Sequence, residues 1–226
     1  MANYLIDPAV LQPYLPCYTE LDTFNGNHYV SLVGFLFTDT KVRGIAVPFH
    51  RTFEEVNLRF YVRYKEAGNW KRGVVFMKEI VPKRAITIIA NTFYKEKYAT
   101  YPMRHSWEET ADGLQVEYGW KVGSEWNFLK AITECEGQAI TAGTEEEFIT
   151  EHYWGYTTID QACTGTYEVV HPKWKVHRVK EFTSYCNVLS LYGQPFEEAL
   201  RQRPQSVFLA EGSAVQVMIG SKIRTP

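Results

Sequence analysis

The sequence lacks the local patterns that mark metal, redox or nucleotide chemistry. Its four cysteines, Cys17, Cys135, Cys163 and Cys186, form no CxxC pair, so we expect reduced residues in the core of an intracellular protein. The six histidines show no HExxH or similar ligand spacing, and there is no GxSxG elbow, P-loop or GxGxxG motif. The sequence therefore predicts neither a stoichiometric metal ion nor a cofactor.

It also lacks an excess of basic residues and any long hydrophobic run. The formal net charge is -2, with 24 Lys and Arg against 26 Asp and Glu, whereas nucleic-acid binding needs clustered cations. The apolar runs, such as 29–37, fall far below the ~20 residues that span a bilayer. Residues 1–15 have no basic start and no apolar core, unlike a signal peptide. We expect a cytoplasmic protein that binds neither nucleic acid nor a membrane.

Aromatic residues, by contrast, are abundant, and they favour β-strands. They make up 15% of the chain, with 15 Tyr and 13 Phe. Alternation and turn-like clusters predict strands at 29–37, 43–48, 56–64, 73–80, 114–122, 127–135, 165–171, 176–184, 206–210 and 214–222. Hairpins are expected around 123–124 and 211–213.

Helices are few in this prediction. They are expected at 82–98, after the N-cap Thr144 with Glu147 at the third helical position, and at 195–202. With no repeat and no linker, residues 1–226 are predicted to form a single, mainly β domain. Its strands should make a large antiparallel sheet that closes into a barrel or folds into a sandwich, with a few peripheral helices.

The segment 54–65, EEVNLRFYVRYK, is the first candidate site. Alternate side chains of a strand face opposite ways, so Glu55, Asn57, Arg59 and Arg63 share one face, opposite an apolar one. Two interpretations are open. The polar face meets water, as is ordinary in antiparallel sheets, or it lines a barrel lumen where the arginines bind a carboxylate or a phosphate.

The segment 147–156, EFITEHYWGY, is the second. His152, Tyr153, Trp154 and Tyr156 place four rings within five positions. This pattern fits a core strand with a hydrogen-bonded histidine. It also fits a general acid or base, His152, beside an aromatic wall.

Lysines of the run YKEKY form a third candidate. Lys95 and Lys97 flank Glu96, and a lysine desolvated beside another cation can form a Schiff base. A solvated helix face is the more ordinary explanation of such a run.

The order and spacing of longer segments resemble the YqjF-like family of uncharacterised bacterial proteins. The resemblance covers roughly residues 15–223, in the segments VSLVGFLF, RGIAVPFH, FEEVNLRFYVR, RGVVFMKEIVPKRAI, ANTFYKEKYATYPM, FITEHYWGY, YEVVHPKW and LYGQPFEEALRQRPQSVFLAEGSAVQV. That family is itself similar to acetoacetate decarboxylase. The similarity implies a closed, cone-like antiparallel β-barrel with an internal cavity, and it favours the lumen interpretation of the strand at 54–65.

The resemblance also implies roles for single residues. Phe53-Glu54-Glu55 matches the decarboxylase pattern around a pocket glutamate, which gives that role to Glu55. The position of the Schiff-base lysine holds Tyr98, and Lys97 stands one residue before it. The nucleophile is therefore not carried over.

Two functions are consistent with the sequence, and it leaves open whether the protein is an enzyme. The first is a barrel that binds a small organic acid or an amphipathic carboxylate. The second is an enzyme that acts on a carbonyl or carboxylate substrate by acid–base chemistry. A structural or assembly protein is a third option, and a homo-oligomer is compatible with each of them. The predicted catalytic residues are Glu55, His152 and Lys97, and the predicted ligand contacts are Asn57, Arg59, Arg63, Tyr98, Tyr153 and Tyr156.

Overall fold

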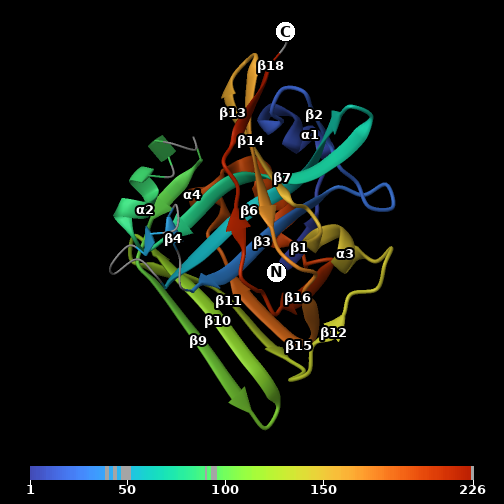
Figure 1. Ribbon diagram of the computed structural model, residues 1–226. Helices are drawn as coiled ribbons and strands as arrows, with labels where there is room; N and C mark the ends of the chain where they lie inside the picture. The colour runs from blue at the N-terminus through green and yellow to red at the C-terminus, as the bar shows by residue number, and fades with distance from the viewer. Residues whose placement is uncertain (39–40, 43–44, 47–51, 90, 93–95, 225–226) are drawn as a thin grey trace.

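The structure is a computed structural model that describes residues 1–38, 41–42, 45–46, 52–89, 91–92 and 96–224. It is mainly β, as predicted from the aromatic and alternating segments (Figure 1). The strands are β1 (Ala2–Leu5), β2 (Thr19–Leu21), β3 (Tyr29–Phe37), β4 (Lys41–Val42), β5 (Ile45–Ala46), β6 (Phe53–Glu66), β7 (Asn69–Val81), β8 (Tyr98–Thr100), β9 (Met103–Thr110), β10 (Gly113–Val122), β11 (Glu125–Thr133), β12 (Gln138–Ala139), β13 (Trp154–Asp160), β14 (Cys163–Val170), β15 (Lys175–Tyr185), β16 (Ser206–Ala210), β17 (Gln216–Val217) and β18 (Ser221–Arg224).

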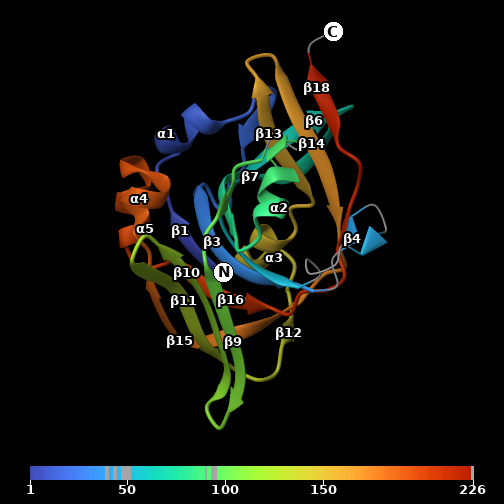
Figure 2. The ribbon, with the colours of Figure 1, turned by 90° about the vertical axis from the view of Figure 1, so that its left-hand side faces the viewer.

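Short helices lie at the periphery of these strands. They are α1 (Pro8–Leu11), η1 (Gln12–Tyr14), α2 (Arg84–Ile89), α3 (Glu145–Thr150), α4 (Val188–Tyr192), η3 (Gln194–Phe196) and α5 (Glu197–Arg201). Figure 2 shows α4 and α5 together beside β1 and β3, and α2 apart from them in the middle of the view. In the described part of the chain, no helix is long and apolar enough to cross a membrane.

Through the described residues, most strands form one hydrogen-bonded path. Its order is β17-β14-β13-β7-β6-β3-β1-β16-β15-β11-β10-β9. Strands β2, β8, β12 and β18 pair beside it, and β4 and β5 form a separate pair. The path begins at β17 and ends at β9 without a ladder between them, so the closed barrel expected from the sequence is not observed. Most neighbours are antiparallel, but β13 and β8 both pair with β7 in parallel.

The long strand β6 separates two buried layers. Its apolar side chains Val56, Leu58 and Phe60 belong to the main hydrophobic core, with residues of β1, β3, β7 and β10. Its opposite face contributes Tyr61 to a smaller core around Phe148 and Ile149 of α3. The strand is therefore covered on both sides, and polar residues on its second face lie inside the protein.

Several local predictions are correct, and others are wrong for identifiable reasons. The hairpin around 123–124 forms, as β10 and β11, and Thr144 caps α3 by accepting a hydrogen bond from the Glu147 amide at 3.4 Å. Of the helix expected at 82–98, the described residues form α2 at Arg84–Ile89 and a π-helical turn at 91–92, and Tyr98 starts a strand that pairs with β7.

The predicted hairpin around 211–213 does not form. Strand β16 pairs with β1 and β15, and β17 pairs with β14 instead. Long-range contacts decide which strands pair here, so a local turn pattern does not predict the pairing.

The predicted strand 43–48 lies largely outside the described residues. The cysteines are all free, but only Cys163 is buried and Cys135 is exposed, against the expectation of core residues.

Candidate functional site: a buried carboxyl cluster

The polar face of β6 meets two further carboxyl groups inside the protein. Strand pairing sets Asn57 of β6 opposite Glu79 of β7, and sets Glu79 opposite Tyr98 of β8. Glu55 lies two residues before Asn57 on the same face of β6. Glu96 precedes β8 and has electrostatic contact with both Glu55 and Glu79. We call Glu55, Glu79 and Glu96 the carboxyl cluster.

Burial of this cluster is nearly complete. Glu55 and Glu79 are each 2% exposed and Glu96 is 8% exposed. Charged carboxylates are almost never buried without cationic partners, because the loss of hydration is costly. Among the described residues, the ion pairs include no Lys or Arg bound to any of the three. The interpretation that this part of β6 faces water is therefore wrong.

Hydrogen bonds join the cluster to an amide and to two phenols. Glu55 accepts from Asn57 Nδ2 and from the Tyr98 hydroxyl, both at 3.0 Å. Glu96 is hydrogen-bonded to Tyr167 of β14. Tyr167 reaches it because Gly155 of β13, its cross-strand partner, has no side chain. A Cβ atom at Gly155 would lie 2.3 Å from the Tyr167 ring.

The cluster holds protons at neutral pH. Burial raises the pKa of Glu55 to about 7, and the neighbouring Glu96 carboxylate adds to the shift. Burial also raises the pKa of Glu96 to about 7. It raises the pKa of Glu79 well above its ordinary value, and the charges of Glu96 and Glu55 push in the same direction. Glu79 and Glu96 share a hydrogen bond, which requires a proton between two carboxyl groups.

Four buried polar atoms on this face have no hydrogen-bond partner among the described residues. Three are acceptors: Asn57 Oδ1, one oxygen of Glu79 and one oxygen of Glu96. The fourth is a donor, the Nε of Arg59. Buried polar groups in native proteins are usually paired, so an unpaired set of this size needs an explanation.

Arg59 and Arg63 end up in different surroundings. Arg59 is partly buried and donates from Nη2 to the Ile149 carbonyl at 3.3 Å. Arg63 lies nearer the end of β6, where it pairs with Glu20 at 2.5 Å and stacks on Trp70. Only Arg59 therefore adjoins the carboxyl cluster.

His152, predicted as a catalytic residue, belongs to a second and separate buried group. Its Nε2 lies 3.1 Å from Asp22 Oδ2, and the Arg72 Nε lies 2.6 Å from the same oxygen. Burial lowers the pKa of His152, against the effect of Asp22. The rings of Tyr61 and Phe148 pack against the imidazole. We call Asp22, Arg72 and His152 the histidine cluster.

The remaining predicted residues do not join either cluster. Lys97 is exposed, its ammonium lies 5.8 Å from the centre of the Tyr14 ring, and its link to the carboxyl cluster is an electrostatic contact with Glu96 and Glu79. The hydroxyl of Tyr153 donates to Glu151, and its ring contacts His171. Tyr156 is buried, and its hydroxyl donates to the Lys71 carbonyl at 3.1 Å. Lys95 lies outside the described residues.

Three members of the site were missed from the sequence. Glu79, Glu96 and Tyr167 come from β7, from the segment before β8 and from β14, and only the sheet pairing brings them together. The motif KEIVP around Glu79 carried one usable signal. A glutamate within a largely apolar strand is expected to be buried, and a buried carboxyl group is a candidate for a functional site.

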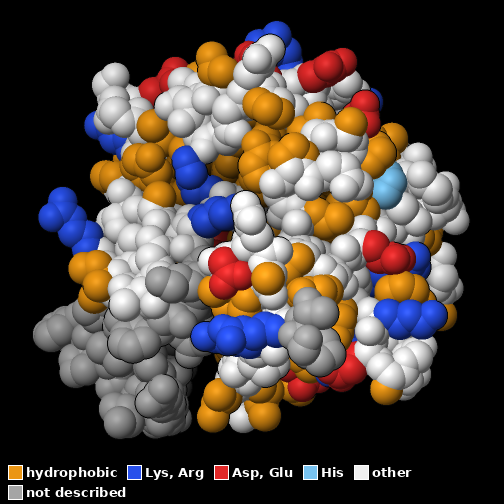
Figure 3. All heavy atoms as spheres, turned by 90° about the horizontal axis from the view of Figure 1, so that it is seen from above, with side chains coloured by type: hydrophobic (Ala, Val, Ile, Leu, Met, Phe, Trp, Pro, Cys, Tyr) orange, Lys and Arg blue, Asp and Glu red, His pale blue; other side chains and the backbone are white. Residues whose placement is uncertain are grey.

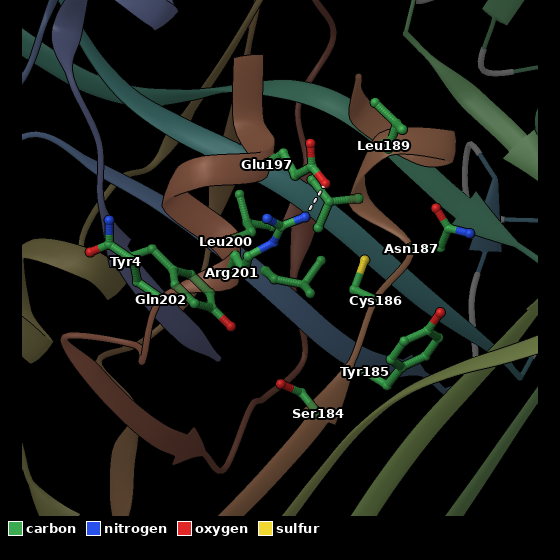
Figure 4. A pocket seen from close by; sticks show the side chains of 12 residues that line it. Tyr4, Ser184, Tyr185, Cys186, Asn187, Leu189, Glu197, Leu200, Arg201 and Gln202 are labelled. Atoms are coloured by element: carbon green, nitrogen blue, oxygen red, sulfur yellow. Dashed lines mark hydrogen bonds and ion pairs between the residues drawn. The ribbon is translucent and has the colours of Figure 1, made fainter. Parts of the chain in front are cut away.

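Two hollows lie elsewhere on the protein. The larger, about 500 Å³, lies between the end of β15 and the helices α4 and α5. Figure 4 shows Cys186 projecting into it, with the ion pair of Arg201 and Glu197 beside it. The Leu32 side chain in its wall belongs to the main core, so this hollow lies across the sheet from the carboxyl cluster.

The smaller hollow, about 230 Å³, is lined by Tyr156, Trp154 and residues of β18. The molecule seen from above mixes hydrophobic, basic and acidic side chains over its visible face (Figure 3). Neither hollow is lined by the carboxyl cluster. What marks the cluster is its burial and its unpaired polar atoms. In the described part of the chain, no group of His, Cys, Asp and Glu is arranged to hold a metal ion.

The fold places the protein among acetoacetate-decarboxylase-like structures. It is similar to acetoacetate decarboxylase from Legionella pneumophila, with a TM-score of 0.59 and 13% identity over 98% of this chain and 79% of that one. The enduracididine biosynthesis enzyme MppR complexed with pyruvate has a TM-score of 0.61 and 10% identity, over 96% and 86%. An acetoacetate decarboxylase-like enzyme from Sphingomonas wittichii RW1 has a TM-score of 0.56 and 12% identity, over 99% and 87%.

The sequence then fixes the family. The chain belongs to DUF2071, a family of uncharacterised conserved proteins, whose model matches residues 1–214. It is also 28% identical over 205 residues to the uncharacterised protein YqjF of Bacillus subtilis, covering 88% of this chain and 80% of that protein. The resemblance noted from the sequence is confirmed at the level of family and fold.

Proposed function

We propose that this protein binds a small organic acid beside the carboxyl cluster, and that the cluster exchanges a proton with it. The observation that carries the proposal is the burial of three carboxyl groups together, with no Lys or Arg ion-paired to them among the described residues. Such an arrangement opposes folding, and strongly shifted carboxyl groups occur preferentially at functional sites.

Arg59 and the carboxyl groups would contact different parts of the ligand. The unpaired Nε of Arg59 is a donor for the ligand carboxylate, as guanidinium groups suit carboxylates. The protonated carboxyl groups supply donors to a carbonyl oxygen, which ionised carboxylates cannot do. The fold of MppR, a protein whose structure holds pyruvate, supports the choice of a small oxo acid as the first probe.

The test is calorimetric titration with pyruvate and acetoacetate at pH 6 and pH 8. Affinity should fall as the pH rises through about 7, because ionised Glu55 and Glu96 repel an anion. Arg59→Gln should weaken binding about tenfold or more, the expected loss of a charged hydrogen bond. Arg63→Gln, on the same face of β6 but paired with Glu20, is the matched control and should bind normally. Equal loss in both variants, or no binding by the native protein, contradicts the proposal.

A second candidate function, proton-transfer catalysis, rests on Glu55 itself. A carboxyl group with a pKa of about 7 is suited to take and return a proton near neutral pH. Acting as a base on pyruvate, Glu55 would remove a methyl proton, leave an enolate and return a solvent-derived proton to the same carbon.

This catalysis is measured by proton NMR of pyruvate in D2O. The enzyme hypothesis expects faster loss of the methyl signal with the native protein and background loss with Glu55→Gln. Glu54→Gln is the control, since Glu54 faces the other way and contacts His105. Binding without any exchange leaves the protein a binding module.

A further inference from the structure

We propose that the natural ligand is a zwitterion of the amino-acid class, held by its carboxylate at Arg59 and by its ammonium group between Asn57 and Glu79. The inference rests on the proposed function and names the ligand class for the same site. It is carried by the juxtaposition of one unpaired donor and several unpaired acceptors on one face of β6 and its neighbour β7.

Asn57 is the decisive residue on the acceptor side. It is 1% exposed, and its Nδ2 already donates to Glu55. Its Oδ1 has no donor among the described residues. A proton shared among the glutamates can satisfy their own oxygens, but an amide oxygen does not take up a proton. No donor reaches this oxygen in the structure, and an N–H group of a ligand would satisfy it.

Glu79 places a second acceptor beside the first. It is the direct cross-strand partner of Asn57, and one of its oxygens is also unpaired. Opposed residues in antiparallel strands bring their Cβ atoms within about 5.5 Å. A group with several N–H donors and a positive charge satisfies both atoms at once, and an ammonium group has three donors.

Arg59 places the opposite charge on the same face of β6, with its Nε unpaired. It follows Asn57 by two positions on the same face, a separation of roughly 6–7 Å along an extended strand. A zwitterion such as 4-aminobutyrate has a charged group for each end, whereas a simple organic acid can occupy only the Arg59 end. The site therefore has one pole for a carboxylate and another for an ammonium group.

The experiment compares three probes of equal chain length: 4-aminobutyrate, butyrate and butylamine. Calorimetry on the native protein should show 4-aminobutyrate binding about tenfold more tightly than butyrate, the value of one charged hydrogen-bonded contact. Glu79→Gln and Asn57→Ala should abolish this preference while leaving butyrate affinity within about twofold. Glu66→Gln, at the exposed end of the same hairpin, is the control and should keep the preference.

The outcomes separate this inference from the proposed function. Equal affinity for 4-aminobutyrate and butyrate, with both lost in Arg59→Gln, overturns the inference and leaves organic-acid binding intact. Failure of all three probes and of pyruvate overturns both. The comparison on the native protein decides the inference even where Asn57→Ala does not fold, and circular dichroism identifies that case.

Discussion

The carboxyl cluster and the histidine cluster both bury carboxyl groups, yet only in the histidine cluster do charged and hydrogen-bonding partners outweigh the burial. Asp22 receives hydrogen bonds from both Arg72 and His152, which outweigh its burial and lower its pKa to about 2. The three glutamates of the other cluster have no such partner among the described residues, and burial raises their pKa values instead.

The difference separates two uses of buried charge. A carboxylate whose hydrogen bonds and opposite charges replace its lost hydration fixes neighbouring elements in place. Here Asp22, beside β2, is tied to Arg72 of β7 and to His152 after α3. A cluster of like groups without compensation does not help folding, so its presence is better explained by function.

Removal of the balanced charge should give the largest effect. Asp22→Asn leaves Arg72 and the buried His152 without their carboxylate, and breaking such a pair costs about 3–5 kcal/mol. Chemical denaturation at pH 7 measures this loss. Glu20→Gln, which breaks the exposed pair with Arg63, should change the free energy of unfolding by less than about 1 kcal/mol. Similar values for the two variants would mean that the histidine cluster is not structural.

Removal of a charge from the carboxyl cluster should instead increase the free energy of unfolding. The pKa of Glu55 rises from 4.5 to about 7 on folding, so the folded state binds more protons than the unfolded state between these values. Its contribution to stability is therefore lost as the pH rises from 4.5 to 7. At pH 8, Glu55→Gln should be more stable than the native protein by on the order of 2–3 kcal/mol.

At pH 4 most of this advantage should disappear, because Glu55 is then neutral in the folded state and mostly neutral in the unfolded state. Denaturation curves of Glu55→Gln and of the control Glu54→Gln at the two pH values show whether the substitution raises or lowers the free energy of unfolding. Destabilisation by Glu55→Gln at pH 8 would show that the Glu55 charge is compensated after all.

The two clusters also differ in how far the sequence predicts them. Alternation along β6 correctly grouped Glu55 and Asn57 on one face, because a single strand determines that relation. The partners Glu79, Glu96 and Tyr167 depend on long-range pairing of β6, β7, β8 and β14, which no local pattern encodes. His152 was singled out for its aromatic neighbours, but its partner Asp22 lies 130 residues away in the chain.

The smallest expected effect concerns Lys97, next to the position where related decarboxylases hold their nucleophile. Desolvation lowers the pKa of Lys97, although the nearby Glu96 and Glu79 carboxylates favour its ammonium form and oppose that shift. Its side chain is exposed and lies by Tyr14, outside the carboxyl cluster. Tyr98 lies inside the cluster but has no amine with which to form an imine.

Borohydride treatment of the native protein with acetoacetate or pyruvate should therefore leave the intact mass unchanged. Acetoacetate decarboxylase treated in the same way is the positive control for the trapping reaction. A trapped adduct on this protein that disappears in Lys97→Ala, but persists in Lys83→Ala, would assign an imine to Lys97. That outcome would place the reactive chemistry beside the carboxyl cluster, with the glutamates serving to tune a neighbouring amine.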